Sequence, residues 1–302
     1  MTVESLAAAP PTSQAQAVST GRTISSVTVD GVKLAVHRGG RGVPVVGLNA
    51  IGHDAHDFDA LAARVGDRFE VIAIEWPSHG ESGPDVQPVS ARRYAELIVG
   101  AIDQLGIERP IVIGNSIGGA AAIQYASRRE VRGLVLCNSG GLTEVTPFAA
   151  RYCGLFARFF AAGERGAWWY DRAFRFYYHQ VLTEPAAAAQ RARVISNGRR
   201  LARQIREAWQ SFGRPQADVR DVAAGLDVPI WVAWAERDKV LPLRYCLPAI
   251  RRLRNATLST FHAGHCAFLE QPDAFAAGFL EFAGRLPTPL AGPAAASVGS
   301  DG

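Results

Sequence analysis

Short apolar runs alternate along the chain with longer segments in which apolar residues recur every three or four positions. The short runs are rich in Val and Ile and are bounded by turn-forming residues, which is typical of strands. They cover residues 25–29, 33–38, 43–48, 71–75, 111–114, 131–137, 230–234 and 256–261. The first two are joined by Asp30-Gly31, which predicts a hairpin. The alternation of strands and helices predicts an α/β fold, with a mostly parallel sheet covered by helices on both faces.

Two helical patterns differ in their setting. Between Ser90 and Gly106 the apolar residues fall on one helical face, which predicts an amphipathic helix against the sheet that ends at the glycine. Between residues 143 and 228 the strand signal is lost, and the sequence becomes aromatic and arginine-rich. Apolar residues there recur at helical spacing at Leu201, Ile205, Trp209 and Phe212. We interpret residues 143–228 as an inserted helical cap.

The length of 302 residues, 48% of them apolar, fits one catalytic domain. The predicted core comprises residues 23–142 and 229–286. Residues 1–22 are rich in Ala, Pro, Ser, Thr and Gln, residues 287–302 have a similar composition without periodicity, and both predict flexible tails. The first tail lacks the apolar core of a signal peptide, and no apolar run approaches the roughly 20 residues of a membrane span. We therefore expect a cytoplasmic protein with no membrane partner.

A candidate nucleophile follows the strand at 111–114, where the chain reads Gly114-Asn115-Ser116-Ile117-Gly118 before a helical run. This is G-x-S-x-G in a strand, turn and helix context. A turn tight enough to expose a serine hydroxyl leaves room only for glycine on either side. The backbone N–H of Ile117 would then face an oxyanion developing beside Ser116.

A serine needs an imidazole to take its proton and a carboxylate to orient that imidazole. Asp238 follows the strand at 230–234, and His265 follows the strand at 256–261, in the order Ser, Asp, His. Rival candidates are Glu236 and Asp227 for the acid and His262 for the base. We favour Asp238 and His265 because of their places after the strands, and we interpret His37, His56 and His179 as structural.

These segments resemble the α/β-hydrolase superfamily over about residues 23–285. Its acid turn, G-x-x-D-x-x-x-P, is matched from Ala235 to Pro242 with alanine in place of the glycine, and its base motif, G-H-x-x-x-x-E-x-P, is matched from Gly264 to Pro272. The resemblance implies the fold and a second oxyanion donor after the third strand. At that place the chain has Asn49-Ala50-Ile51-Gly52 instead of H-G-x, and in register the second N–H is that of Ile51.

Two branches of the superfamily share local motifs with the chain. The loop at 49–52 is similar to the N-S-L-G stretch of enol-lactonases, whereas segments 114–116 and 138–142 are similar to hydrolases that cleave carbon-carbon bonds of ring-fission products. The second branch commonly has tryptophan after its histidine, where this chain has Cys266. The loop from Glu75 to Gly83 resembles a superfamily loop to which we assign a structural role. Ser116 stands where epoxide hydrolases and haloalkane dehalogenases require aspartate, which disfavours those activities.

Charge and composition bear on partners. From Arg151 to Arg214 twelve arginines face four acidic residues, a formal excess of eight positive charges. This excess indicates either steering of an anionic substrate or a solvated helical face. Aromatic residues at 168–170, 174 and 176–178 either wall the pocket above Ser116 or form cap core. No nucleic-acid-reading motif accompanies the basic residues, and the four widely spaced cysteines predict neither a disulfide framework nor a metal site.

Together these features predict a hydrolase without cofactor or metal that acts on a small-molecule ester or lactone through an acyl-enzyme. Cleavage of a carbon-carbon bond in a vinylogous diketone is the alternative reaction. A hydrolase-like receptor or binding protein with little turnover is the alternative of another class. The sequence leaves the native substrate and the oligomeric state open.

Overall fold

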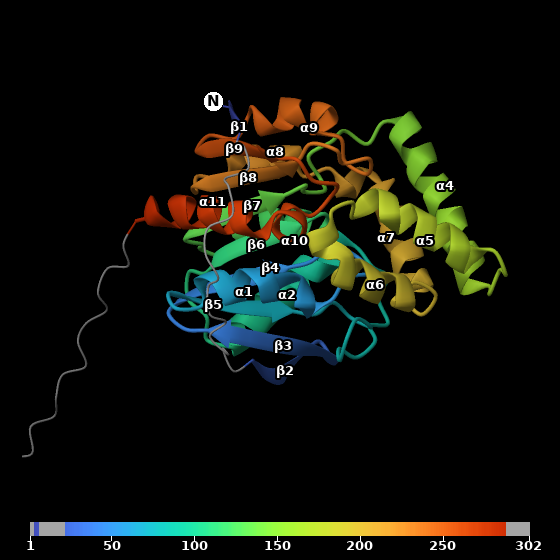
Figure 1. Cartoon of the computed structure of the whole chain (residues 1–302), viewed down its shortest axis with the longest axis horizontal. Coiled ribbons are helices and arrows are strands. Elements are labelled where there is room, and N and C mark those ends of the chain that lie inside the picture. The colour runs from blue at the N-terminus through green and yellow to red at the C-terminus, as the bar shows by residue number, and fades with distance from the viewer. Residues whose placement is uncertain (1–2, 6–21, 288–302) are drawn as a thin grey trace, which may run out of the picture.

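The computed structural model describes residues 3–5 and 22–287. These residues form a nine-stranded sheet in the order β1-β9-β8-β7-β6-β4-β5-β3-β2 (Figure 1). The strands are β1 (Val3–Ser5), β2 (Thr23–Val29), β3 (Val32–Gly40), β4 (Val43–Leu48), β5 (Phe69–Ile74), β6 (Ile111–Asn115), β7 (Gly133–Cys137), β8 (Ile230–Ala235) and β9 (Ala256–Phe261). Among these described strands the pairs β2–β3 and β3–β5 are antiparallel, and all other neighbouring pairs are parallel.

The predicted hairpin is confirmed. It joins β2 to β3 through Asp30 and Gly31, which have φ angles of 50° and 78°. Positive φ at both central residues is what a type I′ hairpin turn requires. The predicted α/β fold with a mostly parallel sheet is confirmed as well.

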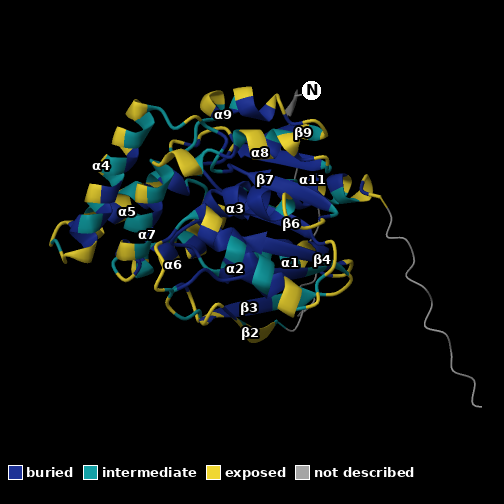
Figure 2. Cartoon of the chain, turned by 180° about the vertical axis from the view of Figure 1, so that it is seen from behind, coloured by how far each residue is buried: buried dark blue, intermediate teal, exposed yellow. Residues whose placement is uncertain are grey.

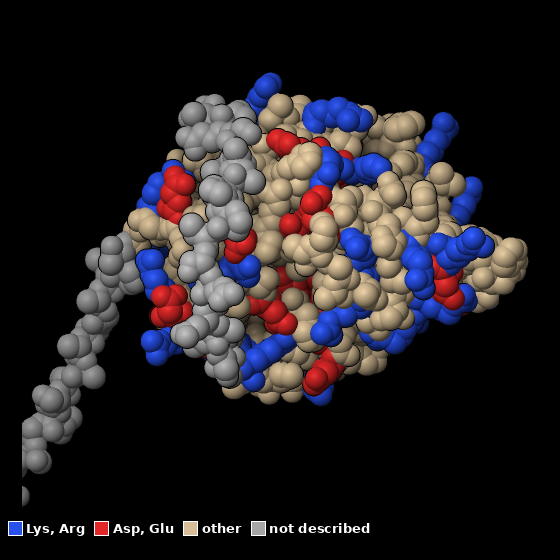
Figure 3. All heavy atoms as spheres, viewed as in Figure 1, with Lys and Arg blue, Asp and Glu red and all other residues tan. Residues whose placement is uncertain are grey.

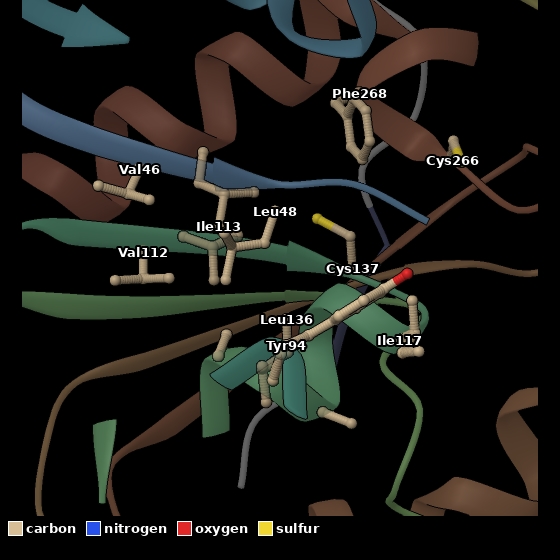
Figure 4. Close-up of a cluster of buried hydrophobic side chains, with 14 of the residues drawn as sticks. Val46, Leu48, Tyr94, Val112, Ile113, Ile117, Leu136, Cys137, Cys266 and Phe268 are labelled. Carbon is tan, nitrogen blue, oxygen red and sulfur yellow. The ribbon is translucent and has the colours of Figure 1, made fainter. Parts of the chain in front are cut away.

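Helices cover both faces of this sheet. One face carries η1 (Ala55–Phe58), α1 (Asp59–Val65), α10 (Ala267–Glu270) and α11 (Pro272–Gly284), and the other carries α2 (Ala91–Gln104), α3 (Ile117–Ala126), α8 (Arg220–Gly225) and α9 (Leu243–Ile250). The predicted helix after Ser90 is α2, whose first turn is capped by the Ser90 hydroxyl accepting from Arg93 N. In Figure 4, Val46, Ile113 and Leu136 of three strands lie between Tyr94 of α2 and Phe268 of α10.

Between β7 and β8 the described chain forms only helices: α4 (Pro147–Glu164), α5 (Tyr170–Val181), η2 (Pro185–Ala187), α6 (Ala188–Asn197), α7 (Ala202–Phe212), η3 (Pro215–Ala217) and α8. In Figures 1 and 2, α4 to α7 lie beyond one edge of the sheet. Their aromatic residues form much of their own packing, as where Phe156 of α4 stacks on Trp209 of α7 with ring centroids 4.3 Å apart. Of the aromatic cluster in the sequence, Tyr170 and Phe174 are buried and Trp168 is exposed.

The structure differs from the sequence-based expectation at the N-terminus. Residues 3–5, predicted as part of a flexible tail, pair in parallel with Leu258, Ser259 and Thr260 of β9. The short Val-Glu-Ser segment is held by backbone pairing at a sheet edge. Such pairing does not require a hydrophobic periodicity, and the segment has none. The remainder of that predicted tail and nearly all of the predicted C-terminal tail lie outside the described residues. No helix in the described part of the chain is long and apolar enough to cross a membrane.

Candidate active site

Ser116 lies in a strained turn between β6 and α3. Its φ and ψ are 55° and −120°, a conformation that non-glycine residues rarely adopt. The flanking glycines are sterically required, because a Cβ on Gly114 would lie 2.4 Å from the Gly118 carbonyl oxygen, and one on Gly118 would lie 2.2 Å from that of Leu48. The turn therefore places the serine at the carboxyl edge of the sheet and at the N-terminus of α3, as the motif predicts.

Asp238 and His265 meet at the same edge. Asp238 follows β8 and His265 follows β9, and the histidine Nδ1 lies 2.7 Å from Asp238 Oδ2. Both side chains are buried. Burial alone would lower the pKa of His265, but the charge and hydrogen bond of Asp238 outweigh it and raise that pKa above its ordinary value.

The Asp238 carboxylate is held by four donors. Its Oδ1 accepts from the backbone N–H of Val240 and Leu241 at 2.7 and 3.0 Å, and its Oδ2 accepts from Asn138 Nδ2 at 2.6 Å as well as from the histidine. Asn138, at the end of β7, also exchanges hydrogen bonds with the backbone of Ala235. The rival carboxylates, Glu236 and Asp227, are exposed.

Asn115 connects the serine turn to the histidine loop. Its Nδ2 donates to the carbonyl oxygens of His265 and Cys137 at 3.2 and 2.9 Å, and its Oδ1 accepts from the Cys266 thiol at 3.0 Å. In the described part of the chain no hydrogen bond joins the Ser116 hydroxyl to the His265 imidazole. The structure thus brings the predicted residues to one edge, with the Asp238–His265 pair formed and the serine contact open.

The backbone N–H groups of Ile117 and Ile51, which the sequence predicts as oxyanion donors, have no hydrogen-bond acceptor among the described residues. The loop that carries Ile51 is anchored by its neighbours. The N–H of Gly52 donates to His79 Nε2 at 3.0 Å, and Trp76 Nε1 donates to the Asn49 carbonyl at 2.8 Å. His79 must then donate from Nδ1 to the Pro77 carbonyl, 2.9 Å away.

Burial lowers the pKa of His79 to about 4, so the ring is neutral at neutral pH and can accept from Gly52. In the same loop the buried carboxylate of Glu75 accepts from the N–H groups of Ala55 and Glu81 at 3.3 and 2.7 Å. The loop from Glu75 to Gly83 therefore stabilises the segment around Ile51, in agreement with the structural role that we assigned to it.

Glu270 joins the histidine loop to the inserted helices. Its carboxylate accepts from the consecutive N–H groups of Gly264, His265 and Cys266 at 2.8 to 3.1 Å. It also accepts from the N–H of Thr183 and of Glu184, which lie between α5 and η2, at 2.8 and 3.2 Å. The buried Glu270 carboxylate thus holds the backbone of His265 against the segment between α5 and η2.

Sequence reasoning missed a second buried histidine pair. His53 Nδ1 lies 3.0 Å from both carboxylate oxygens of Asp57, and both side chains are buried. The His53 ring lies 5.9 Å from that of Tyr178 of α5. The i, i+4 spacing was visible in the sequence, but nothing there distinguished this pair from polar residues on an exposed helix face. The rival base that the sequence offered, His262, is exposed.

A cavity of about 910 Å³ opens beside the serine. Ser116 and Ile117 lie in its wall with Gly140 and Gly141. The opposite wall is mainly apolar and comes largely from α4 and α7, with Tyr152, Cys153, Trp209 and Phe212. Charged side chains also border the cavity at Glu144, Glu207, Arg214, Lys239 and Arg244. A volume of this size is at the upper end of typical small-molecule sites.

A mostly parallel sheet, a strained serine turn at its carboxyl edge and a buried His–Asp pair define a member of the α/β-hydrolase fold class. The model of the alpha/beta hydrolase family matches residues 45–278, and the chain belongs to that family. It is therefore an enzyme of the hydrolase class.

Individual relatives are more distant. A pimeloyl-[acyl-carrier protein] methyl ester esterase of Neisseria meningitidis is 29% identical to this chain, and the match covers 78% of this chain and 90% of the esterase. A 2-hydroxy-6-oxononadienedioate/2-hydroxy-6-oxononatrienedioate hydrolase of a Pseudomonas species is 26% identical, and the match covers 72% of this chain and 78% of that hydrolase. The solved enol-lactonase of Burkholderia xenovorans has a TM-score of 0.70 and 20% identity, covering 86% of this chain and all of the other.

Proposed function

We propose that the protein hydrolyses a carboxylic ester or lactone through an acyl-enzyme formed on Ser116. The observation that carries this proposal is the buried His265–Asp238 pair at the same sheet edge as the strained serine turn. A serine in that turn with a paired imidazole beside it is the arrangement that acyl transfer needs. The similarity to an esterase and the fold likeness to an enol-lactonase support the same reaction class.

The proposed mechanism follows from the hydrogen bonds. Because Asp238 accepts from Nδ1, the imidazole of His265 keeps Nε2 free of a proton and can receive the one on Ser116 Oγ. The serine oxygen then attacks the substrate carbonyl carbon, and the N–H groups of Ile117 and Ile51 stabilise the oxyanion. His265 returns the proton to the leaving alcohol, and water cleaves the acyl-enzyme by the same steps in reverse.

The open contact between Ser116 and His265 does not conflict with this mechanism, since catalytic hydrogen bonds in ligand-free structures are commonly long and shorten in the substrate complex. We propose that α4 to α7 act as the cap over the site, because α4 and α7 supply the apolar wall facing Ser116. The cavity volume and that wall favour an acid or alcohol part of medium size.

Hydrolysis of a carbon-carbon bond in a vinylogous diketone is the second candidate reaction. It is supported by the similarity to the Pseudomonas protein, which is named as a hydrolase of 2-hydroxy-6-oxononadienedioate and 2-hydroxy-6-oxononatrienedioate. The thiol of Cys266 occupies the position after the histidine where that branch commonly has tryptophan, and it bonds to Asn115 instead of projecting an aromatic ring. This departure favours the ester or lactone reaction.

A panel of short and medium p-nitrophenyl esters, an enol-lactone and a ring-fission dienoate tests the proposal. We expect the wild type to turn over an ester or lactone and Ser116→Ala to lose that turnover while keeping its thermal unfolding temperature. Ser139→Ala is the matched control, because Ser139 is also buried near the turn and bonds only to a backbone carbonyl. Full activity of Ser116→Ala would rule out the acyl-enzyme, and turnover of the dienoate alone would favour carbon-carbon cleavage. Binding without turnover would favour the receptor alternative.

A further inference from the structure

The outer side of α4 carries large apolar residues in the open. Phe148, Tyr152 and Leu155 stand at helical spacing on one stripe, and Phe148 and Leu155 are 79% and 62% exposed. Trp168, in the loop after this helix, is 90% exposed. Single exposed apolar residues are ordinary on soluble proteins, but several along one helix mark an interaction surface. Figures 1 and 2 show α4 at the outer edge of the molecule, far from the sheet.

This stripe is continuous with the cavity at the candidate active site. Phe148 and Tyr152 belong both to the stripe and to the cavity wall. Towards the other end of α4, the ring of Phe159 lies 6.0 Å from that of Trp169, which is partly exposed in the following loop. Apolar surface therefore runs from the mouth of the cavity along α4 to the loop.

Arginines without acidic partners lie on α4, directly after it and on α5. Among the described residues, no carboxylate lies within 4.0 Å of the guanidinium groups of Arg151, Arg158, Arg165, Arg172 and Arg175, and all five are exposed. The nearby acids are already paired elsewhere, Glu164 with Arg206 and Asp171 with Arg199. Figure 3 shows Lys and Arg spheres at the outer end of the molecule, where α4 and α5 lie. We call the stripe, Trp168 and these five arginines the α4 face.

We propose that the α4 face docks the protein on an anionic lipid surface, with the mouth of the cavity toward the lipid. A helix with aromatic and Leu side chains on one side and Arg beside them has the composition of helices that lie in the headgroup region. Exposed tryptophan prefers that region because its ring is amphipathic. Such docking requires no membrane-spanning helix, and it revises our expectation from the sequence that the protein has no membrane partner.

The charges decide between possible occupants. In a symmetric dimer formed through this face the same patch would meet itself, and unpaired arginines would face arginines. An acidic protein would satisfy the arginines, but it would not by itself account for a large apolar stripe that leads into a cavity. An anionic bilayer surface accommodates both, since headgroups pair with arginines while the apolar side chains enter the acyl boundary.

The location of the face suggests what docking would achieve. If Ser116 cleaves an ester, an apolar substrate could pass from the lipid along Phe148 and Tyr152 into the cavity without crossing water. This consequence depends on the proposed function, whereas the docking itself does not. Lipid binding can therefore be measured on Ser116→Ala as well as on the wild type, so that failure of one proposal is distinguishable from failure of the other.

Cosedimentation of the full chain with phosphatidylcholine vesicles, with and without phosphatidylglycerol, tests the proposal. We expect binding to the vesicles that contain phosphatidylglycerol, and that binding should weaken as salt rises. The double variant Leu155→Ser/Arg158→Glu should bind about tenfold more weakly, since it removes one apolar contact and reverses one charge near the surface. Neither residue lines the cavity, so hydrolysis of a water-soluble short ester should be unchanged.

The matched control is Ile24→Ser/Arg254→Glu, which makes the same kind of change at an exposed position on β2 and at an exposed arginine before β9. It should bind vesicles as the wild type does. Equal affinity for both kinds of vesicle, or equal weakening by the two double variants, would overturn the proposal. Absence of binding to any vesicle would overturn it as well, and an acidic protein would then be the partner to seek.

Discussion

Backbone strain at Ser116 is compensated by contacts that only this local sequence allows. A non-glycine residue at such φ and ψ costs about 1–3 kcal/mol. The helix of α3 and the close backbone approach at Gly114 and Gly118 hold it in place. The backbone of Ser116 therefore has little freedom to move, and we propose that the reactivity of its hydroxyl depends on the imidazole of His265.

The first prediction at this scale concerns Asp238→Asn. The amide cannot accept from all four donors that now hold the carboxylate, and it favours the wrong tautomer of His265. We expect kcat/KM to fall by on the order of 10⁴ while the fold is kept. Steady-state kinetics on the preferred ester measure this loss. Asp227→Asn, at an exposed carboxylate, serves as control, and a minor effect at Asp238 would assign the acid role to another residue.

The second prediction is the pH dependence of that reaction. His265 acts as base only when neutral, and Asp238 raises its pKa above 6.5 in spite of burial. The value of kcat/KM should therefore rise with pH and reach half its plateau above pH 6.5. In Asp238→Asn the midpoint should move down, because the charge that raises the pKa is gone. A profile that is flat through this range would exclude His265 as the base.

At the scale of elements, the three catalytic candidates lie in the segments that follow strands and not in the strands themselves. Strands β4 and β9 coincide with their predicted ranges, since Val-rich and Thr-rich runs are bounded there by clear turn residues. Strand β7 begins at Gly133, two residues later than predicted, because Arg132 N bonds to the Pro110 carbonyl outside the sheet. Asn138 and Glu270 lie in segments that the sequence matched to superfamily motifs. The hydrogen bond of Asn138 to Asp238 and those of Glu270 to Thr183 and Glu184 could not be predicted, because they depend on how distant segments pack.

The prediction at this scale is a loss of stability in Glu270→Gln. An amide nitrogen would meet several of the backbone N–H donors that now bond to the carboxylate of Glu270. Unsatisfied buried donors cost about 1–3 kcal/mol each, so we expect the unfolding temperature to fall by about 2–10 °C.

Differential scanning calorimetry measures this difference. Glu281→Gln, at an exposed position of α11 that pairs only with Arg285, is the control and should leave the unfolding temperature nearly unchanged. Equal effects of the two variants would show that the Glu270 contacts contribute nothing special to stability.

Over the whole molecule, the sequence predicted the class of fold, the order of the catalytic candidates and an inserted helical region. The class of fold follows from the strand and helix periodicities. The order of the catalytic candidates follows from the rule that the carboxyl ends of parallel strands share one edge of the sheet. The packing of α4 on α7 could not be predicted, because helical spacing shows which side is apolar but not which partner it meets. The pairing of residues 3–5 with β9 was also invisible, since backbone hydrogen bonds leave no mark on residue type.

A prediction at this scale follows from the excess of arginines between Arg151 and Arg214, the last of which borders the cavity. If they attract anionic substrates, kcat/KM for an ester with a carboxylate should fall steeply from low salt to about 1 M, where the Debye length is about 3 Å. A neutral ester of the same length is the control and should respond weakly. Parallel responses of the two esters would reject electrostatic steering.

The most direct test of the central claim is labelling with a fluorophosphonate, which reacts with serines activated for acyl transfer. Intact mass and peptide mapping of the full chain should show one adduct, on Ser116, formed faster in wild type than in Asp238→Asn and absent in Ser116→Ala. Labelling of a different serine, or none while the ester is still hydrolysed, would contradict the assignment of Ser116 as the nucleophile.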